Sequence, residues 1–263
     1  MTKIKRANLF GAELTVTTYA ELLEITDELI AKKPSEPYRY NFCNVHVVMM
    51  TLENPKLKEA VNHPRALSVT DGMPLVWAIR KLGGIPMEDR VYGPTFFEKA
   101  LKHRTGEIKH FLYGSTQETV DALLEKAKKE IPDLNVVGTY IPPFRPLTEE
   151  EKKELIDQIN NSQADIVWVC LGAPKQEVFI DEIAPKLNVP IMAAVGAAFA
   201  FYAGKTSQAP AFLQKIGMEW FYRLLMEPRR LFVRYFKYNP WYLWKFFAAR
   251  LSGHKLPQSE SEL

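Results

Sequence analysis

The sequence of 263 residues contains little cysteine and no long apolar run. Its two cysteines, Cys43 and Cys170, lie inside apolar, strand-like stretches, and the first residues lack the basic, apolar and small-residue layout of a signal peptide. We therefore expect a reducing, cytoplasmic compartment. Because no stretch approaches about 18 uninterrupted apolar residues, we do not expect a membrane-spanning helix.

Several motifs of nucleotide and metal chemistry are also missing. No Gly-x-Gly-x-x-Gly follows a strand-like run, which argues against a nicotinamide enzyme. The stretch Gly204-Lys205-Thr206 has Phe199 where a Walker loop needs its first glycine. The histidines are scattered, and neither Cys-x-x-Cys nor Asp-x-Asp occurs. We therefore expect neither a bound metal nor a cofactor.

Charge is distributed unevenly along a chain whose overall composition is that of a globular protein. The net charge is only +3. Between Lys205 and Lys255, however, ten basic residues stand against two glutamates, a net charge of +8 that leaves −5 for the remainder. Thirteen aromatic residues lie between Phe212 and Phe247 of the same segment. This asymmetry indicates a segment that meets an anionic surface.

The middle of the chain alternates short apolar runs with helical periodicity. We expect strands at 38–44, 66–69, 110–113, 135–140, 165–171 and 190–195, with helices between them at 74–82, 93–103, 117–129, 149–160 and 175–187. Thr18 with Glu21 and Thr148 with Glu151 form capping boxes, and Ser115 is a plausible helix cap. This alternation predicts an α/β fold, a Rossmann-like open and mostly parallel sheet with helices on both faces.

The composition divides the chain into three parts. We expect an α/β core at 1–204, a helical, basic and aromatic appendage at 205–254, and a disordered tail at 255–263. Pro228 and Pro240 would divide the appendage into about three helical pieces.

One face of the appendage would be basic if its helices ran on past Pro228. At helical spacing, that face would carry Arg223, Arg230, Arg234 and Lys237.

Polar residues follow two of the expected strands. Asp71 comes after the run at 66–69, and Asn44 follows the run at 38–44. In open α/β sheets ligands bind at the carboxyl ends of strands, so Asp71 is a candidate base and Asn44 a candidate ligand contact. Each side chain could instead cap the helix that follows it, and for Asn44 alone that role is the commoner one.

Other candidate contacts lie in turns and a loop. Glycine-containing turns after three strands, at 114–116, 171–174 and 195–198, would let backbone amides approach a diphosphate. In the loop after residue 83, Arg90 could bind a phosphate or a carboxylate, or could be a solvated side chain paired with Glu88.

Five motifs then occur in order over roughly residues 5 to 237. They are Thr70-Asp71-Gly72-Met73-Pro74, Arg90-Val91-Tyr92-Gly93, Leu171-Gly172-Ala173-Pro174-Lys175-Gln176-Glu177, Val195-Gly196-Ala197-Ala198-Phe199, and a segment from Ala209-Pro210 to Arg230 that contains Gly217-Met218-Glu219-Trp220-Phe221-Tyr222-Arg223. As an ordered set they make the chain resemble the WecG/TagA/CpsF family of glycosyltransferases.

This resemblance implies an inverting glycosyltransferase. It would move a sugar of the N-acetylmannosamine type, or a related hexose or uronic acid, from a UDP-sugar to a polyprenyl-diphosphate-linked sugar in cell-surface polysaccharide synthesis. The implied partners are this donor, this acceptor and the anionic inner face of the cell membrane, to which the protein would bind peripherally. Nucleic acid is not an implied partner, and a homo-oligomer is left open.

The resemblance also implies roles for individual residues. Asp71 stands where the family's proposed catalytic base stands. The nucleotide-sugar site would include Asn44, Arg90, Gly172, Gln176 and Gly196, and the residues for the diphosphate or the membrane would be Arg223, Arg229 and Arg230. Three positions depart from the family pattern, namely Phe42, Thr70 and Ala200 in place of threonine, proline and aspartate. These departures leave the donor sugar open.

Two other interpretations of the appendage remain. A basic, aromatic segment on an α/β domain could belong to a non-enzymatic protein that binds single-stranded nucleic acid by stacking and phosphate contacts. The aromatic residues could also simply pack the appendage onto the core. Aromatic residues mixed with leucine, methionine and valine favour a helix at a lipid interface.

Overall fold

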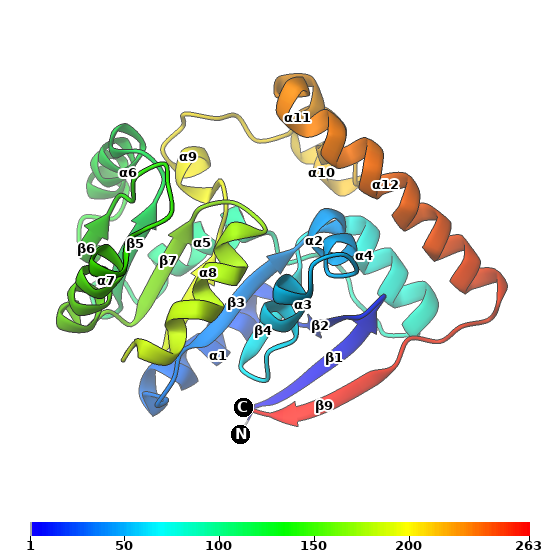
Figure 1. Ribbon diagram of the computed structural model, residues 1–263, viewed down its shortest axis with the longest axis horizontal. Helices are drawn as coiled ribbons and strands as arrows, with labels where there is room; N and C mark the ends of the chain where they lie inside the picture. Colours follow the sequence, from blue (N-terminus) through cyan, green and yellow to red (C-terminus); the bar gives the residue numbers. More distant parts are fainter. Residues whose placement is uncertain (1) are drawn as a thin grey trace.

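A nine-stranded sheet forms the centre of the protein (Figure 1). The computed structural model describes residues 2–263, with the side chains of all these residues except Ala211 and Arg230. The strand order is β6-β5-β7-β8-β3-β4-β2-β1-β9. The strands are β1 (Lys3–Leu9), β2 (Ala12–Val16), β3 (Tyr38–Cys43), β4 (Ala66–Thr70), β5 (Lys109–Gly114), β6 (Asn135–Tyr140), β7 (Ile166–Cys170), β8 (Ile191–Ala194) and β9 (Gln258–Glu262).

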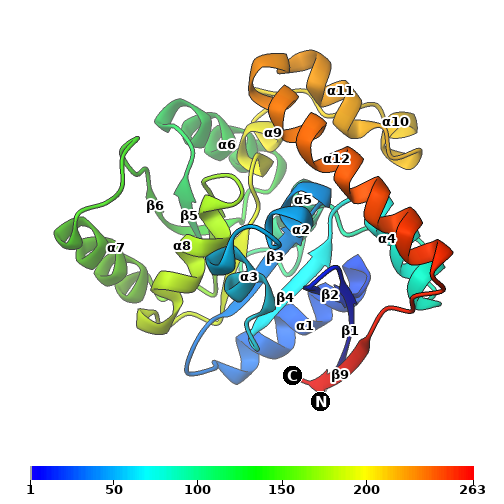
Figure 2. The same cartoon turned by 45° about the vertical axis from the view of Figure 1, so that its right-hand side comes forward.

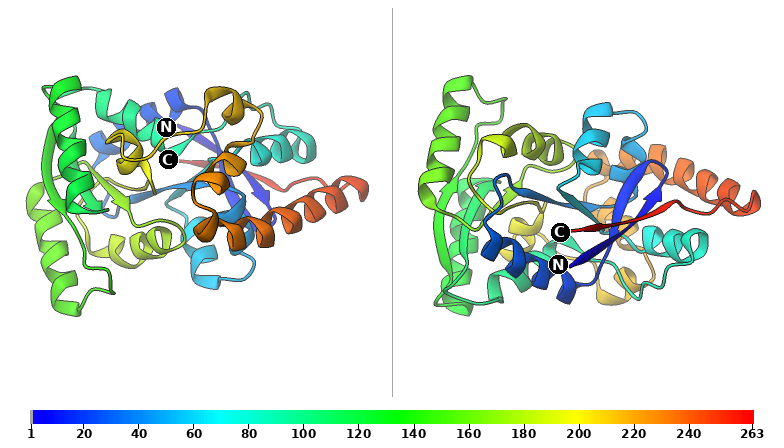
Figure 3. Two further views of the ribbon diagram at one scale, coloured as in Figure 1. Left: turned by 90° about the horizontal axis from the view of Figure 1, so that it is seen from above. Right: turned by 90° about the horizontal axis from the view of Figure 1, so that it is seen from below.

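The sheet is parallel from β6 to β2 and antiparallel at the β1 and β9 edge. Successive residues of its central strands enter opposite hydrophobic clusters. In β7, for example, Trp168 packs with one cluster, whereas Val167 and Val169 pack with another. A strand buried on both faces needs helices on both faces, and Figure 3 shows them there. The predicted fold class is confirmed.

The helices of the core begin close to the predicted positions. They are α1 (Tyr19–Lys32), α2 (Val45–Met50), α3 (Pro55–Asn62), α4 (Met73–Ala78), the π-helix η1 (Ile79–Gly83), α5 (Gly93–Lys102), α6 (Gln117–Glu130), α7 (Glu149–Ser162), α8 (Lys175–Ile183), the 3₁₀ turn η2 (Ala184–Lys186) and α9 (Ala198–Tyr202).

The predicted capping boxes open α1 and α7. Ser115 does not cap α6, because the Thr116 side chain accepts the capping hydrogen bond from Thr119. Ser115 instead has a φ of 67°, in the left-handed region.

The appendage consists of α10 (Ala211–Lys215), α11 (Glu219–Met226) and α12 (Pro228–Leu251). Figure 2 shows α10 to α12 spanning one end of the core, where α12 packs against α2. The chain leaves helical geometry at Glu227, with φ −134° and ψ 57°, so α11 and α12 do not share a continuous face. The condition for a basic stripe on both sides of Pro228 is therefore not met.

Pro240 does not divide the appendage, because α12 continues through it. A proline inside a helix removes one backbone hydrogen bond and usually bends or breaks the helix. Here its two neighbouring turns are held against the core: Tyr238 and Tyr242 are buried, and Tyr242 donates to the Pro74 carbonyl at 2.6 Å. Tertiary packing thus holds together a helix that local sequence would interrupt.

The prediction of a disordered tail at 255–263 is wrong. The chain returns to the sheet as β9, which pairs antiparallel with β1. In this register Glu262 lies opposite Lys3 and Glu260 opposite Lys5, and cross-strand pairs of opposite charge stabilise a sheet. Leu256 and Leu263 are buried at the two ends of the segment. The polar composition of this segment is therefore that of an edge strand whose charges match those of β1.

Among residues 2–263, no helix has the length and apolar character needed to cross a membrane.

Candidate active site

The turn after β4 places Asp71 at the carboxyl end of the sheet. The Asp71 backbone N–H donates to the Cys43 carbonyl at 2.7 Å, which joins the ends of β4 and β3. One oxygen of the Asp71 carboxylate accepts from the Gly93 N–H at 3.1 Å, at the beginning of α5. The N-cap of α4 is Gly72, with no side-chain hydrogen bond. Asp71 therefore does not cap the helix that follows it.

The pKa of the Asp71 carboxyl group differs from that of an ordinary aspartate. Burial raises the pKa of Asp71 to about 8; the positive charge of Arg90 opposes this increase and the negative charge of Glu219 adds to it. The pKa of Asp71 therefore lies well above the value near 4 of an ordinary aspartate. A carboxyl group with a pKa near neutrality is well matched to general-base catalysis.

Asn44 lies beside Asp71 because β3 and β4 are neighbours. Its side-chain oxygen accepts from the Val47 N–H at 3.2 Å, so Asn44 caps α2. The same residue lines the cavity that contains Asp71. The two alternatives considered for Asn44 are therefore compatible: it is a helix cap, and it faces the cavity.

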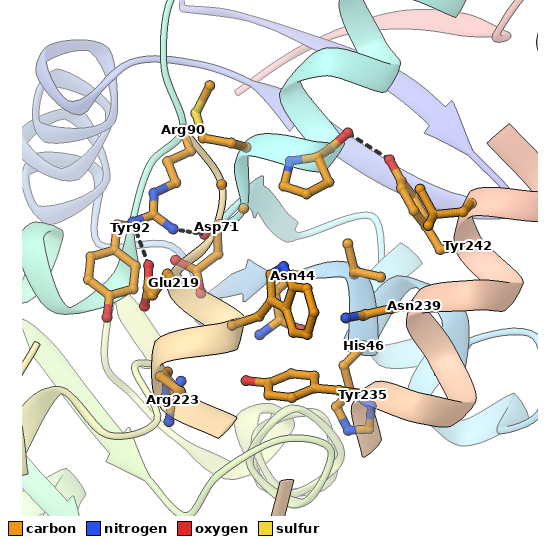
Figure 4. Close-up of a pocket in the computed structure, with 17 residues that line it drawn as sticks. Asn44, His46, Asp71, Arg90, Tyr92, Glu219, Arg223, Tyr235, Asn239 and Tyr242 are labelled. Carbon is orange, nitrogen blue, oxygen red and sulfur yellow. Dashed lines mark hydrogen bonds and ion pairs between the residues drawn. The ribbon is translucent and has the colours of Figure 1, made fainter. Parts of the chain in front are cut away.

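A cavity of about 180 Å³ separates the Asp71 turn from the appendage (Figure 4). The core contributes Asn44, Val45, His46, Asp71, Gly72, Met73, Pro74, Arg90 and Tyr92 to its wall. The appendage contributes Gly217, Glu219, Trp220, Arg223, Tyr235, Asn239, Tyr242 and Leu243. The appendage therefore builds half of this site.

Arg90 is neither solvated nor paired with Glu88. Its side chain is buried, and one of its terminal nitrogens lies 2.6 Å from a carboxylate oxygen of Glu219 in α11. The guanidinium also donates to the Asp71 backbone carbonyl at 3.1 Å and to the Gln214 side chain at 3.0 Å. Its predicted contact with a nucleotide sugar stays a prediction.

The three arginines predicted in the appendage have different environments. Arg223 lines the cavity, partly buried, with its Cζ atom 5.8 Å from the Phe201 ring centroid. Arg229 is exposed near the start of α12 and is not part of the cavity wall described here. The side chain of Arg230 lies outside the described residues. Only Arg223 is brought to Asp71 by the described structure.

Gln176 fixes two glycine turns at the carboxyl end of the sheet, and none of these three residues is part of the wall of the Asp71 cavity. Its side-chain oxygen accepts from the Gly172 N–H and from the Gly196 N–H, each at 3.0 Å. Its side-chain nitrogen donates to the Ala194 carbonyl and to Glu177, each at 3.1 Å. These four bonds use the hydrogen-bonding capacity of the amide, so Gln176 holds the two turns in place through their backbone groups.

The two glycine turns lie on the same rim as Asn44 and Asp71. Gly172 follows β7 and Gly196 follows β8, which is the neighbour of β3 in the sheet. Both glycines have positive φ, 79° and 58°, a conformation that side-chain-bearing residues rarely adopt. Arg234 of α12 donates to the Ala173 carbonyl at 3.0 Å and so connects the appendage to this rim.

Sequence reasoning missed several polar residues of the cavity wall, among them Glu219 and His46. Glu219 lies in the last of the five sequence motifs, but the sequence indicated only that it is one of two glutamates in the basic segment. His46 lines the cavity and contacts Tyr238, with 4.9 Å between ring centroids. Burial, together with the charges of Arg234 and Lys237, lowers the pKa of His46 to about 3, so this imidazole is neutral at physiological pH. Its position two residues after Asn44 was the available signal.

In the part of the chain that the structure describes, no three histidine, cysteine, aspartate or glutamate side chains are grouped so that they could hold a metal ion.

The sequence profile described as the glycosyl transferase WecG/TagA/CpsF family matches residues 7–256. The chain belongs to this family and is a glycosyltransferase.

One similar protein is the N-acetylglucosaminyldiphosphoundecaprenol N-acetyl-beta-D-mannosaminyltransferase of Bacillus spizizenii strain W23. The two sequences are 29% identical over 188 residues, which cover 71% of this chain and 70% of the relative.

Proposed function

We propose that this glycosyltransferase moves a sugar of the N-acetylmannosamine type, or a related hexose or uronic acid, from a UDP-sugar to a polyprenyl-diphosphate-linked sugar, with inversion at the anomeric carbon. The relative from Bacillus spizizenii carries the corresponding mannosaminyl transfer in its name. The observation that carries the proposal is the Asp71 carboxyl group with its raised pKa, which lines one cavity together with Arg223, between the core and the appendage.

In this mechanism Asp71 is the general base. As the acceptor hydroxyl oxygen attacks the anomeric carbon, its proton moves to the Asp71 carboxylate, and the electrons of the breaking glycosidic bond pass to the terminal phosphate oxygen of UDP. The hydrogen bond from Gly93 orients one carboxylate oxygen, which leaves the other for the acceptor. A raised pKa makes the ionised form a stronger base than an ordinary aspartate.

The departing diphosphate needs positive charge. Arg223 is the cavity residue that would supply it, because the Arg90 charge is already paired with Glu219. The N–H groups of Gly172 and Gly196 already donate to Gln176, so the further donors would be other backbone N–H groups of these two turns, where glycine allows close approach of a phosphate. We therefore expect arginine and backbone groups, and not a divalent metal, to stabilise the leaving group.

The outer surface of the appendage suits a lipid-linked acceptor at the inner face of the cell membrane. Val233, Trp244 and Leu251 of α12 are 72%, 65% and 89% exposed, and exposed Arg229 lies on the same helix. Such a helix binds at an interface through apolar burial and attraction to anionic lipids. Exposed aliphatic side chains stand beside exposed aromatic ones such as Trp244, and only the aromatic ones could stack on nucleic-acid bases. This mixture favours a lipid interface over single-stranded nucleic-acid binding.

A transfer assay tests the function. Purified protein is incubated with a short-chain polyprenyl-diphosphate-linked N-acetylglucosamine as the acceptor. Each reaction also contains one donor, which is UDP-N-acetylmannosamine, its uronic acid or another UDP-hexose. We expect one donor to give a lipid-linked disaccharide with inverted anomeric configuration, and to raise the unfolding temperature by mass action. Transfer from none of these donors would reject the proposal. Salt-titrated oligonucleotide binding beside flotation with anionic liposomes tests the alternative.

A further inference from the structure

Arg90 is the point at which the appendage meets the turn that carries Asp71. One side of its guanidinium donates to the Asp71 backbone carbonyl at 3.1 Å, and the other side contacts Glu219 of α11 at 2.6 Å. Gln214 of α10 accepts from it at 3.0 Å, and the Tyr92 ring centroid lies 4.4 Å from its Cζ atom. Figure 4 shows the Arg90 and Glu219 side chains meeting beside Asp71.

The backbone around this ion pair fits closely enough to fix its position. Gly217, two residues before Glu219, has a φ of 70°, and a Cβ atom added to it would lie 2.8 Å from the Trp77 ring. Arg90 and Glu219 are each only 8% exposed. A buried guanidinium without an acidic partner is strongly destabilised, so Arg90 would otherwise seek the next carboxylate. That carboxylate is Asp71.

We propose that Glu219 is a positioning residue, whose carboxylate holds the Arg90 guanidinium on the backbone of the Asp71 turn and away from the Asp71 carboxylate. This inference rests on the proposed role of Asp71 as the base. A carboxylate paired with arginine has a lowered pKa and is a weak base. Through Glu219, docking of α11 brings Arg223 to the cavity and at the same time keeps Asp71 basic.

The charged and titratable groups around Asp71 agree with this assignment. They come from β3, the 84–92 loop, α1 and α11, and they are Cys43, Arg90, Tyr92, Tyr19, Glu219 and Arg223. Burial is the main reason for the raised pKa of Asp71, and Glu219 is the acidic side chain that adds to it. Loss of the Glu219 charge therefore shifts Asp71 in one direction only, toward a lower pKa.

The first test does not need a substrate. Denaturant unfolding of the Asp71 protein and of Asp71→Asn is measured from pH 4 to pH 10, and the pH dependence of the difference gives the midpoint for Asp71 in the folded state. In a Glu219→Gln background we expect this midpoint to fall by about one pH unit, the size of shift that a nearby opposite charge produces. An unchanged or higher midpoint would overturn the proposal.

The same measurement in an Arg90→Gln background tests whether Glu219 acts through Arg90. We expect Glu219→Gln to move the midpoint much less there, because no guanidinium is left to turn toward Asp71. An equal shift in both backgrounds would mean that Glu219 acts by its charge alone, and the positioning role would be rejected. Glu219→Asp keeps the charge and should leave the midpoint near its original value. This variant serves as the second test of the proposal if Glu219→Gln folds poorly.

The second test uses the transfer reaction. In Glu219→Gln we expect the acid limb of the pH profile to move to lower pH and the plateau rate at high pH to fall about threefold or more, because a base of lower pKa accepts a proton less readily. A loosened fold would instead lower the rate at every pH without moving the limb, and that result would contradict the proposal.

Glu53→Gln is the matched control. Glu53 contacts the same appendage at its outer side, through Lys237 at 2.7 Å and Tyr238 at 2.9 Å, on the surface of the protein. We expect Glu53→Gln to leave the pH profile unmoved, and an equal shift in this variant would overturn the proposal. If the unchanged protein transfers no sugar from any UDP donor, the proposed function fails. The pH midpoints of Asp71 obtained from the unfolding experiments still decide the role of Glu219.

Discussion

The Gly93 N–H donates to the Asp71 carboxylate at 3.1 Å and thereby joins the turn after β4 to the beginning of α5. The amino end of a helix attracts negative charge, so this contact favours the ionised form of Asp71, whereas burial opposes it. The carboxyl group is consequently oriented without being fully ionised.

Replacing Asp71 by asparagine should remove turnover and leave the fold intact. The amide oxygen can still accept from Gly93, but the amide cannot take the acceptor proton, and general-base catalysis contributes about 10²- to 10⁴-fold. Initial rates of sugar transfer measure the loss. Asp121→Asn, an exposed change on α6, is the control and should retain full activity. Activity of Asp71→Asn within tenfold of the original would exclude Asp71 as the base.

The stability of the protein should also depend on pH through Asp71. Its folded-state pKa of about 8 lies above the value near 4 of an unfolded aspartate, so its contribution is fully present below about pH 4 and is lost as the pH rises to about 8. Asp71→Asn does not titrate. Its free energy of unfolding should exceed that of the original protein by about 1 kcal/mol or more at pH 8, since one pKa unit corresponds to about 1.4 kcal/mol. A constant difference from pH 4 to pH 8 would contradict this prediction.

Arg223 and Arg229 should separate catalysis from membrane binding. Arg223→Ala should reduce transfer to a water-soluble, short-chain acceptor by about 100-fold or more, the effect of losing one group that stabilises a transition-state charge. Arg229→Ala should retain that activity and bind less well to anionic liposomes, where each basic residue contributes about 1 kcal/mol. Equal losses in both variants on the soluble acceptor would show that the appendage acts as one unit.

Chelation should leave most of the activity in place. In the described residues no group of acidic, histidine or cysteine side chains is placed to hold a metal ion, and Arg223 lines the cavity instead. Rates with EDTA are compared with rates in added magnesium or manganese. Strict dependence on either ion would reject a leaving group stabilised by arginine and backbone donors.

The β1 and β9 edge should depend on its charge pattern. Glu260→Lys places a lysine directly opposite Lys5 and should lower the unfolding free energy by about 0.2–1 kcal/mol, the range for a cross-strand pair. The double exchange Lys5→Glu with Glu260→Lys should restore most of the loss. If the double exchange is as unstable as the single one, the pairing of β9 does not rest on these charges.

Local sequence was sufficient for the parts of the protein that local forces determine. Strands buried on both faces have continuous apolar runs, so the α/β alternation was predicted, and with it the common edge on which Asn44 and Asp71 lie. Gln176 was predicted at the site because its motif resembles a known family. Its bonds to Gly172 and Gly196 could not be read from the sequence, because they depend on the packing of β7 beside β8.

The remaining errors concern pairs that are far apart in the sequence. Arg90 and Glu219 each resemble solvated charges, and only the docking of α11 buries them together. The polar β9 acquires its order from the lysines of β1, at the other end of the chain. The pKa of Asp71 depends on burial beneath the appendage, which no local pattern reports.

The return of the chain as β9 has a consequence for how firmly the appendage must hold the core. Residues 203–257 leave the core after α9 and rejoin the sheet at its edge, so both ends of the segment are attached (Figure 1). An undocked appendage would therefore stay at a high effective concentration beside the Asp71 cavity. Few and individually weak contacts then suffice for redocking, and the acceptor can exchange without complete separation of the two parts.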